Sequence, residues 1–192
     1  MKKILIINGH PNEDSLNFAI TESYKNGALK SEAVVKEIII SALHFNPNLQ
    51  YGYRKRMELE PDLTDAWQKI LWADHLVWVH PVWWGGLPAI TKGFIDRLFL
   101  PGLAFQYREN SVWWDKLLTG KTAHIITTLD QPSLYYRFFF GRPSVNQLKK
   151  SVLEFCGVKP VKVTYVGIVK TSDEKLRQKW LKKIEKIGEM QK

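Results

Sequence analysis

The sequence predicts an α/β protein in which a parallel sheet of five strands, in the order 2-1-3-4-5, lies between two layers of helices. Short apolar runs alternate five times with longer amphipathic segments along the 192 residues, and such alternation is typical of parallel sheets covered on both faces. Two of the runs are almost continuously apolar, as in strands buried on both sides. The length fits one domain, which we expect to span residues 1–192.

Each expected strand is a short run whose β-branched content favours strand over helix. The expected strands are Lys3–Asn8, Val34–Ile40, His75–His80, Thr122–Thr127 and Lys162–Val166. The expected helices are Asn17–Lys30, Thr64–Ala73, Pro88–Phe99, Ser144–Phe155 and Ser172–Met190. Thr64, Pro88 and Ser172 belong to residue types that commonly begin helices. Within the third helix, Asp96 and Arg97 are expected to form a salt bridge.

The net charge of +9 is unevenly distributed. Residues 1–96 carry 10 Lys or Arg against 11 Asp or Glu, whereas residues 97–192 carry 18 against 8. Part of the excess lies on the last helix, whose Leu176, Trp180, Ile184 and Ile187 are spaced to face the core. A positive surface also attracts phosphate-bearing cofactors. We expect no nucleic-acid partner, because no helix-turn-helix, zinc or RNA-binding signature is present.

The single cysteine, Cys156, excludes an internal disulfide and a cysteine-rich metal site, and we expect it to be buried. The five histidines lack metal-ligand spacing, so no metal is expected. No apolar run approaches the roughly 20 residues that span a bilayer. The first apolar run, Ile4 to Ile7, is too short for a signal peptide. These observations predict a cytoplasmic protein.

The loop after the first strand, residues 8–17, has the composition of an anion site. In a sheet of this order, ligands bind beyond the carboxyl ends of the strands, beside the point where the order reverses. Gly9 permits a tight turn, Ser15 and Asn17 offer side-chain hydrogen bonds, and the next helix contributes free amides. His10 can add a further contact. The loop matches neither the P-loop nor the GxGxxG pattern, and Ser15 or Asn17 acting as a simple helix cap is an open alternative.

The loop after the third strand, residues 80–88, sets Trp83 and Trp84 beside Gly85 and Gly86. Glycine permits close approach of the backbone to a planar ligand, and tryptophan offers a stacking wall. The alternative is that the two indoles pack into the core or against another subunit. Both interpretations place large rings at the mouth of the sheet.

The loop after the fourth strand, residues 127–140, carries aromatic and cationic residues in succession. Such a loop covers a ligand, packs on a partner subunit, or does both, because it would otherwise expose a sizeable apolar patch. The hydroxyls of Tyr135 and Tyr136 can donate protons to a reduced acceptor. Few other polar groups here suit direct chemistry, which indicates that a cofactor carries the reaction.

Taken together, these segments resemble the flavodoxin-like NAD(P)H:quinone reductases, a family that includes bacterial reductases accompanying potassium-efflux systems. The likeness extends over most of the chain. It rests on GHPNEDSLNFA after the first strand, FNP at 45–47, HPVWWGGLPAITKGFIDRLFLPGLAF at 80–105, ITT at 126–128 and LEFCGV near the end. The most specific part is GxPAxxKGxxDR after an aromatic-rich turn. The resemblance implies a flavodoxin-like three-layer sandwich.

The resemblance also implies a function. A non-covalent flavin would take hydride from NAD(P)H and pass it from flavin N5 to a quinone or similar acceptor, in a ping-pong reaction at one site. Family members are usually homodimers whose active sites lie at the subunit interface. By motif, His10, Ser15, Leu16 and Asn17 would hold the flavin phosphate and ribityl chain. Pro81, Val82, Trp83, Trp84 and Gly85 would line the isoalloxazine ring, with Thr127 and Thr128 at its far edge.

The third loop departs from the family pattern. The family often has TTGG followed by a Tyr and a His, whereas here Leu129 and Asp130 follow the two threonines, and the histidine position falls near Gly141. Tyr135 occupies the tyrosine position and is the candidate proton donor. The departure puts the paired proton relay and the acceptor preference in question.

Three alternatives to this assignment follow from the sequence. FMN is favoured because the chain is short, but FAD would fit if residues 46–61 held its adenine and Arg54–Arg56 met a second phosphate. A solvated turn is the simpler interpretation of those cations. A flavin-binding regulatory subunit, associated peripherally with a membrane transporter, is the alternative to an enzyme. A plain electron carrier fits poorly, because such carriers tend to be acidic.

Overall fold

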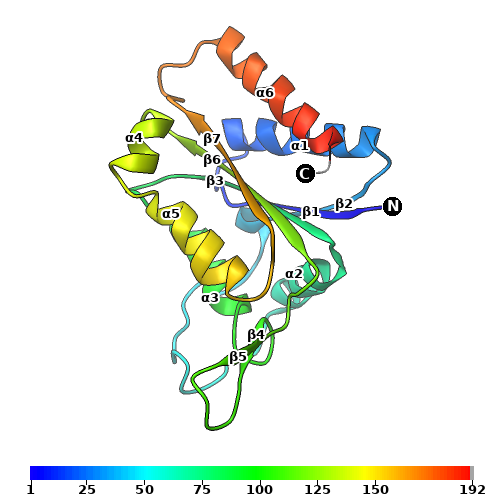
Figure 1. Cartoon of the computed structure of the whole chain (residues 1–192), viewed down its shortest axis with the longest axis vertical. Coiled ribbons are helices and arrows are strands. Elements are labelled where there is room, and N and C mark those ends of the chain that lie inside the picture. Colours follow the sequence, from blue (N-terminus) through cyan, green and yellow to red (C-terminus); the bar gives the residue numbers. More distant parts are fainter. Residues whose placement is uncertain (191–192) are drawn as a thin grey trace.

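A computed structural model describes residues 1–190 of the chain and shows one parallel sheet between two helical layers (Figure 1). Its strand order is β2-β1-β3-β6-β7, which confirms the predicted order 2-1-3-4-5 for the five main strands. These strands are β1 (Lys3–Asn8), β2 (Val34–Ile39), β3 (His75–Pro81), β6 (Thr122–Leu129) and β7 (Val161–Gly167).

Burial explains the composition of the central strands. All seven residues of β3 are buried, as are five of the six in β1, because helices cover both faces of these strands. The edge strands β2 and β7 mix buried and exposed positions. In the register of β3 and β6, His80 lies opposite Thr127 and Pro81 opposite Thr128. This register brings the loops after both strands to the same edge of the sheet.

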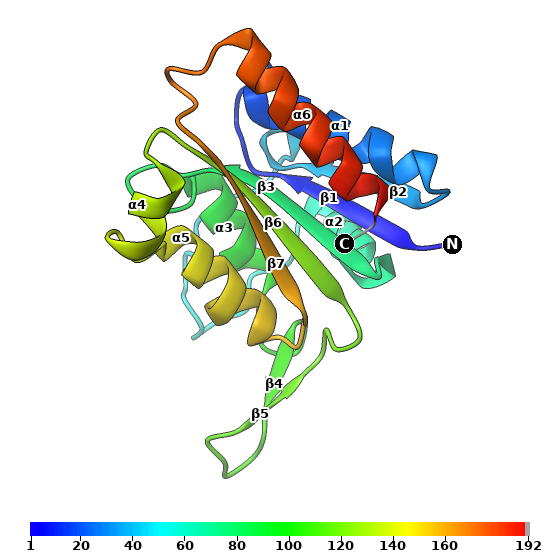
Figure 2. The ribbon, with the colours of Figure 1, turned by 45° about the horizontal axis from the view of Figure 1, so that its top comes forward.

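Helices cover both faces of the sheet (Figure 1, Figure 2). Helices α1 and α6 lie on one face, and α2, α3 and α5 lie on the other. The bounds are α1 (Leu16–Lys30), α2 (Pro61–Trp72), α3 (Ala89–Leu98), α5 (Pro143–Asn146) and α6 (Glu174–Glu189). Helix α5 continues as a π-helix, η2 (Gln147–Glu154), so the expected helix 144–155 has two geometries.

Helix α2 begins three residues before the expected Thr64. Pro61 occupies its first turn after Glu60, a position that suits proline because its missing N–H would have no partner there. Helix α6 begins as expected near Ser172, with the Asp173 carboxylate accepting from the backbone N–H of Leu176 at 2.7 Å.

Three short elements were not expected from the sequence. A hairpin of β4 (Phe105–Tyr107) and β5 (Trp114–Lys116) projects from the body of the molecule. A short helix, α4 (Ser133–Phe138), lies inside the aromatic loop, and a 3₁₀ turn, η1 (Ile40–Ala42), follows β2. Each is too short to give a clear periodicity in the sequence.

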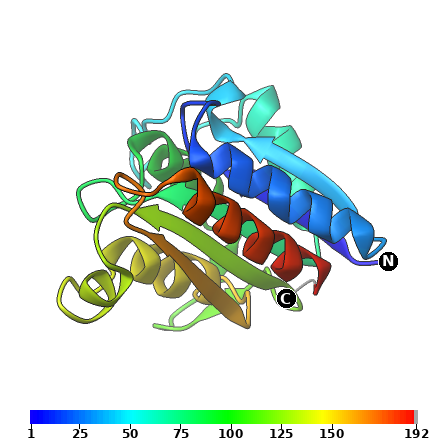
Figure 3. The ribbon, with the colours of Figure 1, turned by 90° about the horizontal axis from the view of Figure 1, so that it is seen from above.

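Helices α1 and α6 run side by side across one face of the sheet (Figure 3). Two glycines make their contact very close: a Cβ at Gly27 would overlap the backbone carbonyl of Glu185, and a Cβ at Gly188 would overlap that of Tyr24. Outside this contact, Lys30 forms an ion pair with Glu185 at 2.5 Å. Backbone therefore packs on backbone, which only glycine permits.

The expected salt bridge between Asp96 and Arg97 is wrong. Asp96 pairs instead with Lys92, one helical turn earlier, at 2.6 Å. The fully buried guanidinium of Arg97 points the other way and pairs with Glu60, with Nη1–Oε1 and Nη2–Oε2 distances of 3.0 and 2.8 Å. It also donates to the carbonyl of Glu58 at 2.8 Å. Adjacent helix residues point about 100° apart, so they seldom pair; Arg97 instead ties α3 to the loop before α2.

Cys156 is buried, as expected, and burial raises the pKa of its thiol to about 12. Arg54, Lys55 and Arg56 are exposed on their loop. Within residues 1–190 no helix combines the length and the apolar character that crossing a membrane requires.

Candidate functional site

Two neighbouring cavities open at the carboxyl ends of the sheet strands, where the three unusual loops meet. The first, of about 230 Å³, is lined by His10, Ser15, Leu16, Asn17, Pro81, Val82, Trp83, Thr128, Leu129, Asp130 and Val169. The second, of about 390 Å³, is lined by Val82, Trp84, Gly85, Leu129, Asp130, Gln131, Tyr136 and Phe140. Because Val82, Leu129 and Asp130 line both, the two cavities adjoin and together make up the candidate site.

Ten of the eleven residues that the family resemblance implied for cofactor binding line this site. They are His10, Ser15, Leu16, Asn17, Pro81, Val82, Trp83, Trp84, Gly85 and Thr128. The eleventh, Thr127, is fully buried on β6 and lines neither cavity. The adjacent Thr128 points to the opposite face of β6, because side chains alternate along a strand.

The loop after β1 is held in place by hydrogen bonds from buried side chains. The buried Asn8 side chain accepts from the backbone N–H of His10 at 2.9 Å and donates to Thr21 at 3.1 Å. The Thr91 hydroxyl donates to the carbonyl of Gly9 at 2.9 Å, and a Cβ at Gly9 would overlap that hydroxyl. Gly9 is thus required by the close approach of α3, and the loop is rigid where it enters the site.

The N-terminus of α1 offers unpaired donors. Ser15 is the N-cap residue, yet its side chain makes no capping bond, and within the described residues its buried Oγ has no partner. The Asn17 Nδ2 is likewise buried and unpartnered there, while its Oδ1 accepts from the Thr128 hydroxyl at 2.8 Å. Thr128 therefore orients the amide so that its N–H donors stay available.

His10 adds a third donor at the same end of the first cavity. Its Nδ1 lies 3.0 Å from the backbone nitrogen of Asn12 and 3.1 Å from the carbonyl oxygen of the same residue. In the neutral tautomer whose Nδ1 accepts from the Asn12 N–H, Nε2 carries the proton and can donate to a ligand. Burial lowers the pKa of His10, which favours that neutral form. Its ring lies edge-on to Trp83, with 5.6 Å between the centroids. Free amides at a helix N-terminus, with hydroxyl and amide donors beside them, favour an anionic group such as phosphate.

The loop after β3 forms a tight two-residue turn. Trp83 and Gly86 exchange both backbone hydrogen bonds, at 3.1 and 2.8 Å, and Trp84 and Gly85 between them have φ values of +51° and +76°. Positive φ at both central residues is the mark of a type I′ turn. The amides of Trp84 and Gly85 lie outside the turn's own bonds, so they can bond the polar edge of a flat ligand.

Trp84 stands in a strained conformation, with its indole fully exposed. Because left-handed backbone costs a bulky residue about 1–2 kcal/mol, and Asn tolerates it before Gly, Trp84→Asn should raise the free energy of unfolding by about 1 kcal/mol. Urea unfolding followed by fluorescence measures this change. Trp113→Asn, at an exposed position without positive φ, is the matched control and should change it little. An unchanged or lower stability of Trp84→Asn would contradict the strain.

Tyr136 and Tyr135 are adjacent but lie in different environments. The buried Tyr136 hydroxyl lies 2.7 Å from Ser144 Oγ and donates to the carbonyl of Gly85 at 3.2 Å, so it ties the turn to α5. Tyr135 is about half exposed, stacks on Phe139 with 5.7 Å between the centroids, and lines neither cavity. The structure thus places Tyr136, which holds the turn, at the cavity wall. Tyr135, the candidate proton donor, is not part of that wall.

Several lining residues were not predicted to belong to the site. Leu129 and Asp130, noted in the sequence only as departures from the family pattern, line both cavities; Val169 lines the first, and Gln131 and Phe140 line the second. The backbone N–H of Val169 donates to the carbonyl of Leu129 at 3.1 Å, and that of Lys170 donates to the Asp130 carboxylate at 2.9 Å. The segment after β7 reaches the site through these bonds, and no local motif in the sequence signals them.

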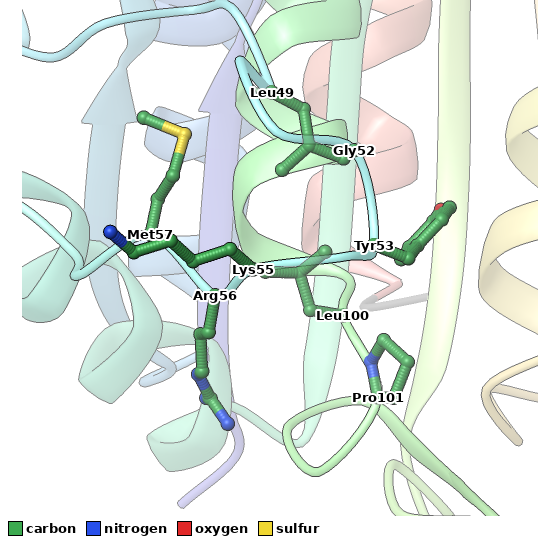
Figure 4. Close-up of a pocket in the computed structure, with 8 residues that line it drawn as sticks. All are labelled: Leu49, Gly52, Tyr53, Lys55, Arg56, Met57, Leu100 and Pro101. Atoms are coloured by element: carbon green, nitrogen blue, oxygen red, sulfur yellow. The ribbon is translucent and has the colours of Figure 1, made fainter.

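A separate pocket of about 140 Å³ lies beside the loop that contains Arg54–Arg56 (Figure 4). Leu49, Tyr53, Met57 and Leu100 contribute to its walls, and the side chains of Lys55 and Arg56 extend in different directions. It shares no lining residue with the candidate site. The cations of this loop are therefore not brought to the donors at the start of α1.

Comparison with known proteins agrees with this architecture. A family model described as flavodoxin-like fold matches residues 2–187. NAD(P)H dehydrogenase [quinone] 1 of Rattus norvegicus is 26% identical over 98% of this chain and 78% of its own length. The FMN-dependent NADH:quinone oxidoreductase of Caldicellulosiruptor saccharolyticus is 29% identical over 98% of both chains. The crystal structure of Smu.1420 from Streptococcus mutans UA159 superposes with a TM-score of 0.85, at 37% identity over 98% of this chain and 99% of that one.

Proposed function

The chain belongs to the flavodoxin-like fold family, as an oxidoreductase related to the NAD(P)H:quinone reductases, and from this premise we propose that it binds FMN and passes hydride from NAD(P)H to a quinone-like acceptor. The relatives support the reaction class, because one is named an NAD(P)H dehydrogenase [quinone] and another an FMN-dependent NADH:quinone oxidoreductase. When bound, FMN would supply the hydride chemistry, receiving from NAD(P)H and delivering to the acceptor in a ping-pong cycle.

The observation that carries the proposal is the set of buried, unpartnered donors at the start of α1. Buried polar atoms in folded proteins nearly always have a hydrogen-bond partner, yet Ser15 Oγ and Asn17 Nδ2 have none among the described residues. A phosphate or ribityl group in the first cavity would satisfy them. His10 and the first amides of α1 would complete that binding site.

The ring of the cofactor would lie against the loops after β3 and β6. Pro81, Val82, Trp83, Trp84 and Gly85 would line it, and the free turn amides would bond its polar edge. Thr128 would stand at the far side, while Thr127 would support that side from within the sheet. The fixed backbone of the type I′ turn orients these groups before the ligand binds, which lowers the entropic cost of binding.

FMN suits the site better than FAD. FAD would need a second region for its adenosine diphosphate portion, and the pocket beside Arg54–Arg56 shares no lining residue with the two cavities. The single group of donors at α1 matches one phosphate. FAD is the alternative, and the pyridine nucleotide can be NADH or NADPH.

For the proton that accompanies reduction of a quinone, we propose Tyr135. Its hydroxyl is on a half-exposed ring, next in the chain to the cavity-lining Tyr136, whereas the Tyr136 hydroxyl is committed to Ser144 and Gly85 and burial raises the pKa of Tyr136. Tyr135→Phe should lower turnover on the order of 100-fold at unchanged stability. Tyr136→Phe should instead lower the free energy of unfolding by about 1–2 kcal/mol.

Steady-state quinone reduction and urea unfolding of these two variants separate the roles. Equal turnover in Tyr135→Phe and the unmodified protein would show that solvent supplies the proton. Equal stability of Tyr136→Phe would show that its hydroxyl does not clamp the turn.

We further propose that the protein is a cytoplasmic homodimer, because NAD(P)H is available there and the face carrying α3, η2 and the hairpin suits a subunit contact. A groove of about 290 Å³ on that face is lined by both kinds of side chain: aromatic ones such as Tyr107 and Phe155, and polar or charged ones such as Lys92 and Asp96. Tyr107, which lines this groove, is exposed. A second copy covering this groove would bury the Tyr107 ring.

The proposal is tested by the visible spectrum of the purified protein, identification of the released flavin, and stopped-flow mixing of the flavin-loaded protein with NADH or NADPH under anaerobic conditions. We expect a bound FMN that bleaches on a catalytic timescale and regains its colour when a soluble quinone is added. A bound flavin that does not bleach would support the regulatory alternative. A protein that binds neither FMN nor FAD would refute the proposal.

A further inference from the structure

A strongly apolar and cationic surface borders the second cavity. It consists of one short segment, which we name the aromatic edge: Leu134, Arg137, Phe138, Phe139, Phe140 and Arg142. Leu134, Phe138 and Phe139 are 63%, 71% and 84% exposed, although large apolar side chains rarely gather on a surface that stays in water. None of these three lines either cavity, so the cofactor would not cover them.

The aromatic edge has a defined shape. Leu134 and Phe138 are four residues apart on α4 and therefore share one face of the helix. The Arg137 guanidinium lies between rings, 5.4 Å from the centroid of Phe138 and 5.5 Å from that of Tyr165. Exposed apolar rings with interspersed cations are typical of segments that insert at the boundary between lipid headgroups and acyl chains.

Charge favours an anionic surface over a second copy of this chain. Residues 131–143 contain two arginines and no acidic residue. A twofold contact centred on this patch would set it against itself, so the cations would face one another without a counter-charge. Helix α4, which carries Leu134, Arg137 and Phe138, lies away from the β4–β5 hairpin in both views (Figure 1, Figure 2), and no residue of the aromatic edge lines the groove near that hairpin, so the proposed dimer contact would leave the aromatic edge exposed.

We propose that the aromatic edge docks on an anionic phospholipid bilayer. Phe140 belongs both to this surface and to the wall of the second cavity, so docking would turn the mouth of that cavity toward the lipid. Resting on the proposed function, the acceptor is then a quinone dissolved in the membrane, which enters the cavity from the acyl region. Docking itself does not depend on the redox activity.

Vesicle co-sedimentation of the FMN-loaded protein tests this inference. The protein should sediment with phosphatidylcholine vesicles that contain phosphatidylglycerol, and should bind pure phosphatidylcholine more weakly. Leu134→Ser/Phe138→Ser should lower the partition coefficient roughly ten-fold or more, because two apolar anchors are lost. Arg137→Gln should weaken binding to the anionic vesicles selectively. The control Val112→Ser/Trp113→Ser removes exposed apolar groups of similar size from the hairpin region and should bind as the unmodified protein does.

Two results would overturn the inference. The first is an unmodified protein that stays in the supernatant with anionic vesicles. The second is a Leu134→Ser/Phe138→Ser protein that sediments normally or becomes monomeric in light scattering, since the latter would show that a second copy covers this surface. Reduction of a water-soluble quinone without vesicles reports the proposed function separately, and Leu134→Ser/Phe138→Ser should retain it.

Discussion

A protein carrying Ser15→Ala and Asn17→Asp together should bind FMN about 1,000-fold more weakly than the unmodified protein, because hydrogen bonds to charged groups contribute about 1.5–3 kcal/mol each. Ser15→Ala removes a buried hydroxyl that has no other partner among the described residues. Asn17→Asp keeps the oxygen that accepts from Thr128 but replaces the free N–H donors with a negative charge, which repels a phosphate at the start of α1.

Fluorescence titration of the protein with FMN measures this loss, and thermal unfolding of the flavin-free forms checks that the fold persists. Glu13→Gln is the matched control: it lies in the same loop, is exposed, and lines neither cavity, so affinity should stay close to that of the unmodified protein. If the double variant bound FMN normally, the donors at α1 would not be the phosphate site.

The second large expected effect is a loss of folding stability at acidic pH. His75 and His80 are buried, and burial lowers the pKa of each to about 3, against about 6.5 in the unfolded chain. For histidines with a depressed folded pKa, the unfolded chain binds protons first, so stability is present above pH 6.5 and is lost as the pH falls toward 3. Between pH 7 and pH 5 each of these two histidines should lower the free energy of unfolding by about 2 kcal/mol, so the two together should lower it by about 4 kcal/mol.

Urea unfolding at a series of pH values measures this slope. His80 has no partner for either ring nitrogen among the described residues, so His80→Leu should remove about half of the pH dependence without leaving a new unpaired group. His44 is almost fully exposed, and His44→Gln should leave the slope unchanged. A flat stability between pH 7 and pH 5 would contradict the neutral, buried state of His75 and His80.

The main sheet was predictable because its signal is local. A strand such as β3, buried along all seven residues, must be apolar throughout, and this composition is visible without any tertiary knowledge. The same holds for most of α6: Ile184 is buried, and Trp180 and Ile187 pack against the core, as their spacing predicted. Leu176, in the first turn of the helix, was expected to face the core but is exposed. In contrast, Arg97 was assigned to the wrong partner, because its true contacts come from Glu58 and Glu60, 39 and 37 residues away.

The candidate site also combines residues with a local sequence signal and residues brought in by distant contacts. Gly9, Ser15 and Trp84 could be singled out because glycine, N-cap residues and paired tryptophans are unusual where a strand ends. Val169 could not, since it reaches the first cavity only through the bond of its backbone to Leu129. The distinction between Tyr135 and Tyr136 likewise depends on α4, whose six residues set adjacent side chains on different sides of the helix.

The glycine contact between α1 and α6 has a consequence for the order in which the molecule is completed. Helix α6 follows all five strands of the main sheet in the chain, and α1, which begins beside the proposed phosphate donors, packs directly on it through Gly27 and Gly188. During synthesis α6 therefore leaves the ribosome after every strand of the main sheet. The nascent chain can pair these strands early, but α1 gains this backbone contact only when α6 arrives.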